Sequence, residues 1–289
     1  MSETGSTVPR RALGRRLRQL RESAGMTIEA AAQKLETSRP RIWRIEKGEN
    51  PLRSGEVWLM CNLYGADDET TAALMALAKE TKAPEWWRVY GDTIPRTLDL
   101  LLGLEQVASA FRWWEEHLVP AILQTEAFAR MVMETDPALS PDEIELRVKA
   151  RMGRQDLLFN RKDPPRFDLV IDETVLERLV AVPEIGRDQL DRLLDAGKSL
   201  PRVTVRVMSR SAGFHPAVQA GSFTILDFPT NQNGNGEPTT VQTDGWITPV
   251  YYTKPEEVTR FIDVFDDLTK RSLDEAASRE FIQNLRSQL

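Results

Sequence analysis

The first fifty residues limit the fold most strongly, because they read as short helices separated by tight turns. Leucines recur at helical spacing over 11–23 and predict a first helix, which Gly25 ends. Thr27 is expected to cap a second helix over 28–35, and Ser38 a third. Two helices joined by so short a turn stand at a steep angle. The later helix of such a pair can enter the major groove of DNA.

The third helix divides its side chains between an apolar and a basic surface. Ile42 and Ile45 are three residues apart and should point into a core, while Arg39, Arg41 and Arg44 project elsewhere. An arginine fork matches the O6 and N7 atoms of guanine together. The pattern therefore predicts base or groove contacts from these arginines.

Charge is distributed unevenly, although the net charge is only −6. Residues 10–53 carry twelve Lys and Arg against five acids, a balance of +7. Residues 84–289 carry 24 basic and 33 acidic groups, a balance of −9. A basic module attached to an acidic body indicates that only the module meets a polyanion.

This basic module resembles the Cro/CI-type (XRE) helix-turn-helix family. The match is carried by Leu17, Leu20, Arg21, Gly25, Thr27, Ala32, Leu35, Ser38, Ile42, Arg44, Ile45, Glu46 and Gly48. The resemblance implies that Arg21 and Glu46 form a structural ion pair between the first and third helices. It also implies that Arg39, Pro40 and Arg44 occupy base-reading positions, and that Gln33 and Thr37 lie near the DNA backbone.

Two departures from the family pattern predict a different set of contacts. Glu36 stands where a turn glycine is often found, and a left-handed conformation there would cost about 1 kcal/mol. Ile28 replaces a glutamine that could hydrogen-bond to DNA. Trp43 is expected to pack rather than to lie against sugar and phosphate. The residues expected to contact phosphate are Arg10, Arg11, Arg15, Thr27, Gln33, Thr37 and Ser38.

The composition of the chain changes after residue 80, and an α+β protein is expected overall. An all-α domain of five helices is predicted over 10–80, a linker over 81–87, and a mixed α+β domain over 88–289. In the second domain, alternation predicts strands over 166–171, 203–208, 222–228 and 246–252. Helical periodicity is found over 97–108, 125–133, 141–159, 187–194 and 256–285. A capping box over 272–275 should split the last of these, and 231–238 reads as a polar loop.

Several short sequence motifs in the second half of the chain resemble the C-terminal domain of WhiJ-like regulators of actinomycetes. They are Trp114, Val119 to Glu126, Ala129-Arg130, Arg151, Arg154-Gln155, Asp163 to Pro165, Asp172-Glu173, Leu176, Gln189-Leu190, Val203, Val205, Val207, Gly213 to His215 and Gly221 to Phe223. The resemblance covers about residues 11–289 and departs from the family at Ala121 and Phe128. It implies a regulator that works with a small partner protein encoded nearby, in an antitoxin-like arrangement.

Two groups in the second half are candidates for a partner or ligand surface. Tryptophan pairs could line an aromatic pocket or a protein hot spot, although such residues more often lie in a core. Arginines three and four residues apart on the 141–159 helix could hold an acidic partner or an anionic ligand. Alternatively, they pair with Glu143 and Glu145 on a solvated face or form a structural bridge to the sheet, and we favour this interpretation. The candidate residues are Trp86, Trp87, Trp113, Trp114, Arg147, Arg151 and Arg154.

The composition gives little support for catalysis or for metal binding. The chain has one cysteine, Cys61, and two histidines, His117 and His215, neither beside a nucleophile motif. We therefore expect no enzyme activity, no catalytic residues, no metal and no cofactor. The absence of a secretory signal and of a long apolar run predicts a cytoplasmic protein, associated with the nucleoid when bound to DNA.

Together these features predict a sequence-specific transcriptional regulator. One small helix-turn-helix covers only a half-site, so a homodimer on a two-fold double-stranded operator is expected. The acidic domain would bind a small partner protein or a small-molecule effector that modulates DNA binding. Two alternatives stay open: an antitoxin-like interaction adaptor with weak or no DNA binding, and a small-molecule-gated repressor.

Overall fold

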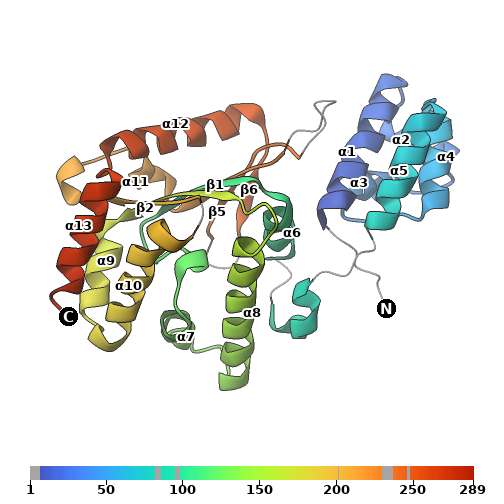
Figure 1. The fold of residues 1–289 in the computed structure, drawn as a ribbon. Helices are drawn as coiled ribbons and strands as arrows, with labels where there is room; N and C mark the ends of the chain where they lie inside the picture. Colours follow the sequence, from blue (N-terminus) through green and yellow to red (C-terminus); the bar gives the residue numbers. More distant parts are fainter. Residues whose placement is uncertain (1–6, 82–85, 95–97, 201, 230–236, 246–247) are drawn as a thin grey trace. The chain divides into compact units, whose positions relative to one another are not determined.

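The computed structural model describes residues 7–81, 86–94, 98–200, 202–229, 237–245 and 248–289 (Figure 1). Contacts among them divide the chain into two compact units. One contains the described parts of Met1–Val89, Asp99–Val107 and Asn231–Glu237, and the other the described parts of the remainder. The domain limits at 80 and 88 stay a prediction. Residues 82–85 of the expected linker and residues 231–236 of the expected loop lie outside the described residues.

The first unit is helical, as the leucine and alanine spacing predicts. Its helices are α1 (Thr7–Ser23), α2 (Ile28–Lys34), α3 (Arg39–Glu46), α4 (Ser54–Tyr64), α5 (Asp68–Glu80) and α6 (Asp99–Val107), together with the first four residues of the 3-10 helix η1 (Trp86–Thr93). Leu13 and Leu17 of α1 pack with Ala31 of α2, Ile42 of α3 and Val57 of α4 in one buried core. Burial of these apolar faces provides the main stabilisation of such short helices.

Helices α1 and α3 approach each other closely at Gly14. A Cβ atom on Gly14 would lie 2.3 Å from the carbonyl oxygen of Ile45, nearer than any real contact allows. Only glycine permits this crossing, which fixes α3 against α1.

The second unit is built around a six-stranded sheet in the order β3-β2-β1-β4-β5-β6. Its strands are β1 (Ala110–Glu115), β2 (Arg166–Asp172), β3 (Val203–Met208), β4 (Phe223–Asp227), β5 (Thr240–Thr243) and β6 (Val250–Tyr252). β1, β2 and β3 run parallel, and β4, β5 and β6 continue the sheet in antiparallel pairs. The protein as a whole is α+β, as the sequence predicts.

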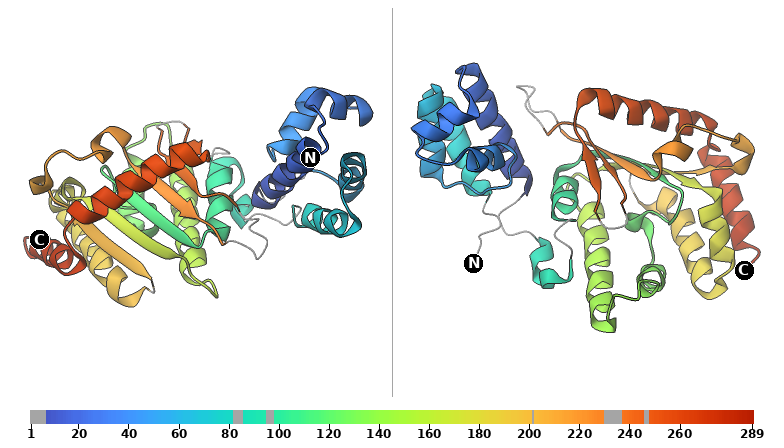
Figure 2. Two further views of the ribbon diagram at one scale, coloured as in Figure 1. Left: turned by 90° about the horizontal axis from the view of Figure 1, so that it is seen from above. Right: turned by 180° about the vertical axis from the view of Figure 1, so that it is seen from behind.

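Helices cover both faces of this sheet (Figures 1 and 2). The remaining helices are η3 (Ala121–Leu123), α7 (Glu126–Glu134), α8 (Pro141–Phe159), α9 (Glu173–Val180), α10 (Pro183–Ser199), η4 (Arg210–Ala212), α11 (Ala217–Ala220), α12 (Pro255–Arg271) and α13 (Glu275–Arg286). α12 lies across one face, where its Phe265 packs with Trp114 of β1. α8, α9 and α10 lie on the opposite face, where Phe159 of α8 contacts Phe167 of β2.

The start of α13 closes the outer edge of β3. The amide of Leu273 donates to the carbonyl of Val207, and the amide of Val207 donates to the hydroxyl of Ser278, both at 2.9 Å. The helix is capped by Asp274, whose carboxylate accepts from the amide of Ala277. The predicted capping box at Ser272 is therefore wrong, because Ser272 lies at the C-terminal end of α12.

Candidate nucleic-acid interface

Helices α2 and α3 form a helix-turn-helix pair joined at a strained turn. Thr27 caps α2, since its hydroxyl accepts from the amide of Ala30 at 3.2 Å. Glu36 has a φ of 49°, in the left-handed region that a side chain disfavours. Ser38 lies at the N-cap position of α3, but its side chain makes no capping hydrogen bond. The expected N-cap position of Ser38 is therefore confirmed, but the expected capping hydrogen bond from its side chain is not made.

We predict that Glu36→Gly stabilises the helical unit by up to about 1 kcal/mol. The change relieves the left-handed strain, and the greater freedom of glycine in the unfolded chain offsets part of the gain. Urea unfolding of wild type and variant measures the difference. Lys34→Gly, at a helical residue of α2, is the matched control and should destabilise by about 1 kcal/mol. An equal loss in both variants would contradict a strain confined to Glu36.

Helix α3 buries one face and exposes the other. Ile42, Ile45 and Glu46 are buried. Pro40, Arg44 and Lys47 follow at spacings of four and three residues on the opposite, exposed face. Lys47 is absent from the contacts expected from the sequence, although its spacing from Pro40 and Arg44 could have indicated it.

The three arginines of this surface differ in their partners. Arg39 Nε lies 2.7 Å from Glu29 Oε1, and both side chains are well exposed. Arg41 pairs with Glu56 of α4. Arg44 is exposed and forms no ion pair with any described residue. Arg44 therefore offers its whole guanidinium fork to an incoming ligand.

The indole of Trp43 is 47% exposed on the same helix. Lys47 Nζ lies 5.8 Å from the centre of its ring, within the range of a cation–π contact. α3 turns this position outward between Arg39 and Lys47, so Trp43 is not part of the buried core, and its expected packing on the linker stays a prediction.

A buried ion pair ties α3 to α1, where the resemblance implies one. Arg21 Nε donates to Glu46 Oε1 at 2.5 Å, and Arg21 Nη2 donates to Glu46 Oε2 at 2.8 Å. Arg21 Nη1 also donates to the carbonyl of Met26 at 2.7 Å. The hydrogen bonds that Arg21 donates to Glu46 raise the pKa of Arg21. This bidentate pair fixes the orientation of α3 and is not available to DNA.

Thr27 caps α2 and Arg10 is half-buried on α1, and the other residues expected to contact phosphate fall into two groups. Gln33 and Ser38 are exposed and Thr37 is half-buried, all beside the start of α3. On α1, both terminal nitrogens of Arg15 donate to Glu237, with the shorter bond at 2.6 Å, and Arg11 lies 3.4 Å from the same carboxylate. Glu237 belongs to the same compact unit. A phosphate would have to replace Glu237 at these two arginines.

Most tryptophans of the candidate partner or ligand surface lie in the interior of the protein. Trp87, Trp113 and Trp114 are buried, and Trp86 is half-buried against Trp87. The indole of Trp87 donates to Asp99 at 2.9 Å. The arginines of α8 differ, because they are all half-buried.

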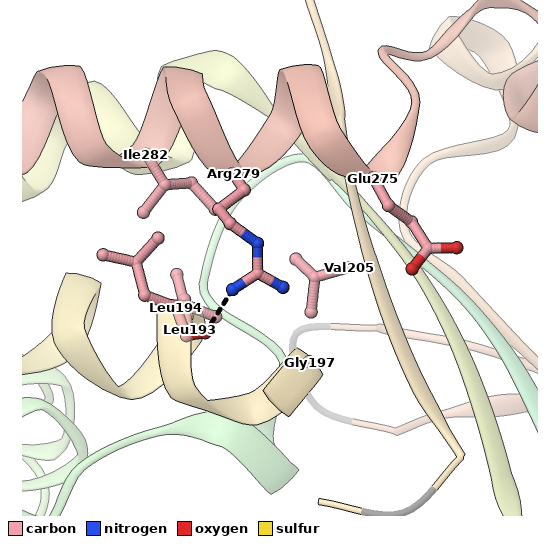
Figure 3. A pocket seen from close by; sticks show the side chains of 7 residues that line it. All are labelled: Leu193, Leu194, Gly197, Val205, Glu275, Arg279 and Ile282. Atoms are coloured by element: carbon pink, nitrogen blue, oxygen red, sulfur yellow. Dashed lines mark hydrogen bonds between the residues drawn. The ribbon is translucent and has the colours of Figure 1, made fainter. Parts of the chain in front are cut away.

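A small pocket lies between α10, α13 and β3 (Figure 3). Leu193, Val205 and Ile282 line it, and the guanidinium of Arg279 occupies its centre. Arg279 Nη1 donates to the carbonyl of Leu194 at 3.2 Å, and Glu275 points away from the pocket. The guanidinium that faces this pocket is therefore already hydrogen-bonded within the protein.

Among the described residues, no group of three or more His, Cys, Asp or Glu side chains is placed to hold a metal ion. Within the same residues, no helix combines the length and the apolar character needed to cross a membrane.

The geometry of α2, its turn and α3 defines a helix-turn-helix DNA-binding domain, and a family model described as a helix-turn-helix domain matches residues 12–74. A second family model, described as a domain of unknown function (DUF5753), matches residues 98–284, well over half of the chain. The protein belongs to this DUF5753 family. No curated protein and no solved structure matches the chain.

Proposed function

We propose that the protein is a sequence-specific transcriptional regulator that reads DNA with the exposed face of α3. The observation that carries this proposal is Arg44, which lies in the middle of that face with no ion pair among the described residues. Pro40 and Lys47 flank it on the same face. An unpaired arginine at this position of a helix-turn-helix can donate both hydrogen bonds to guanine in the major groove.

Arg39 and Arg41 can also contact DNA if each exchanges its carboxylate partner for a group of the DNA. Each is bound to an exposed carboxylate, and exposed ion pairs of this kind contribute about 0.2–1 kcal/mol. A phosphate or a guanine edge can replace so weak a partner. The hydroxyl of Ser38 makes no hydrogen bond within the described residues and lies beside the amides that begin α3, a site suited to phosphate.

The proposed assembly is a homodimer on a two-fold operator, because a single recognition helix spans only a half-site. Two modules about 34 Å apart would gain affinity together. In finer detail, the sequence resembles Cro/CI-type and WhiJ-like regulators. This resemblance supports the proposals that the protein is cytoplasmic and that it works with a small partner protein encoded nearby. The second unit would bind that partner or a small effector and thereby modulate DNA binding.

The proposal is tested by affinity capture of sheared genomic DNA from the source cell at about 150 mM salt, followed by sequencing. Wild type and the Arg39→Ala/Arg44→Ala double variant are compared side by side. A few sharp peaks with a two-fold motif, lost in the double variant, would support the proposal. Equal enrichment of all sequences by both proteins would reject sequence-specific reading by α3.

For Arg44 alone, we predict that Arg44→Ala weakens binding to the captured operator by about 1–3 kcal/mol and relaxes one base position per half-site. A bidentate contact to a base is lost, while the phosphate contacts remain. Titration of a labelled operator and of point-substituted operators measures both effects. Arg260→Ala, at an exposed position of α12, is the matched control and should bind as wild type. A uniform loss on all operators would assign Arg44 to the phosphate backbone.

A further inference from the structure

Helix α8 gathers three arginines on one face of the second unit. Arg147, Arg151 and Arg154 are spaced by four and three residues, so their side chains lie on the same side of the helix. All three are half-buried rather than fully solvated. Like charges repel one another, which makes the grouping of Arg147 with Arg151 costly unless an anion compensates it.

The acids expected to neutralise these arginines are engaged elsewhere. Glu143 forms the capping box with Ser140 at the start of α8. Glu145 accepts from Arg130 at 2.7 Å and lies 3.2 Å from Lys149. Hydrogen bonds from Ser140, and more weakly the charge of Arg147, lower the pKa of Glu143. The solvated pairing with Glu143 and Glu145 is thus absent for Arg147 and Arg151 within the described residues.

Arg151 has a neutral partner in place of a carboxylate. Its Nη1 donates to Gln124 Oε1 at 2.6 Å, and Gln124 is itself buried. Burial lowers the pKa of Arg151 to about 10, and the charges of Arg154 and Arg147 act in the same direction. A half-buried cation without a counter-ion among the described residues is unfavourable, and a bound anion can remove part of that cost.

Arg147 adds a second observation that points to a missing ligand. Its Nε atom is buried and has no hydrogen-bond partner among the described residues. Buried N–H groups are nearly always satisfied in native proteins, by the protein itself or by something bound to it. Two neighbouring guanidinium groups therefore have donor capacity that the described part of the chain leaves unused.

We infer that Arg147 and Arg151 form a binding site for a small anion that carries a phosphate or a carboxylate group. The planar guanidinium fork matches both groups in two parallel hydrogen bonds. The half-buried setting favours a small molecule over a broad protein surface. The inference concerns the second unit alone and does not depend on DNA binding.

The test is a calorimetric titration of the full-length protein, without DNA, with inorganic phosphate and, separately, with succinate. Chloride keeps the ionic strength constant, so that screening alone gives no signal. We expect saturable binding of at least one probe, and the stronger of the two identifies a phosphate or a carboxylate ligand. Arg147→Gln should weaken it at least about tenfold, since a charge-assisted contact is lost.

Arg130→Gln is the matched control, because Arg130 lies nearby but is already bound to Glu126 and Glu145. It should bind the probes as wild type. NMR of the wild-type protein gives a second measurement that needs no variant: phosphate or succinate should shift the Nε–H signal of Arg147. The inference would be overturned by binding heats no larger than those measured with chloride. Equal binding of the probe by Arg147→Gln and wild type would also overturn it. That second outcome would assign any bound phosphate to another part of the chain, including the arginines of the helix-turn-helix.

Discussion

Arg21→Ala is expected to remove about 3–5 kcal/mol from the stability of the helical unit. Arg21 and Glu46 are 6% and 7% exposed, so the substitution leaves a buried carboxylate without its partner. The carbonyl of Met26 also loses a donor. Calorimetric unfolding should show the transition of this unit at a markedly lower temperature. DNA binding should fall with it, because α3 loses its attachment to α1.

Arg18→Ala is the matched control, since Arg18 is a neighbouring residue of α1 whose pair with Glu22 is exposed. It should cost less than about 1 kcal/mol. The double variant Arg21→Met/Glu46→Leu should recover much of the stability lost by Arg21→Ala, because it leaves no unpaired charge buried. A loss below about 1 kcal/mol for Arg21→Ala would contradict the buried pair.

Glu115→Gln is expected to remove a pH dependence from the stability of the second unit. Burial, together with the charge of Asp244, raises the pKa of Glu115 to about 8, despite hydrogen bonds from Ser222 and Trp113. The unfolded chain releases this proton near pH 4.5, so between these values the folded state holds one proton more. Stability therefore falls as the pH rises toward 8. From pH 6 to 9 the loss should reach about 2–3 kcal/mol in wild type.

Urea unfolding at pH 6, 7.5 and 9, followed by the fluorescence of the indoles, measures this slope. Glutamine matches the protonated carboxyl in size and stays neutral, so the variant should be much less sensitive to pH over this range. Glu134→Gln replaces an exposed carboxyl on α7 and should keep the wild-type slope. Parallel slopes for wild type and Glu115→Gln would show that Glu115 does not hold the extra proton.

The helix-turn-helix is readable from the sequence because its signals are local. Leucine and isoleucine spacing sets the helices, and Thr27 and Gly25 mark their ends. Even the strain at Glu36 follows from comparing one residue with the usual turn glycine, and its φ of 49° confirms that expectation. The side chain of Ser38 is less predictable, because a cap position can be occupied without the capping hydrogen bond being made.

The sheet is harder to predict where strands are buried on both faces. The expected strands over 166–171 and 203–208 are confirmed. In β1, burial alternates only over the first four residues, because Trp113, Trp114 and Glu115 are all buried in succession. Its place between β2 and β4 follows from long-range pairing alone.

Side-chain partners across long sequence separations are the least predictable part of the candidate site. The sequence places Arg39, Arg41 and Arg44 on one helix, yet nothing local shows that two of them pair with acids and the third does not. On α8, Glu145 is four residues from Lys149 but fifteen from Arg130, which also binds it. Only the tertiary structure shows that Arg147 and Arg151 lose this acid to their neighbours.

The contacts of α13 with Val207 have a consequence for self-association. An unpaired strand edge is a template on which another chain can add a strand, as in domain swapping and fibril growth. Here the hydrogen bonds from Leu273 and to Ser278 occupy that template at β3. An added strand therefore cannot hydrogen-bond to β3 at Val207 unless the start of α13 is displaced.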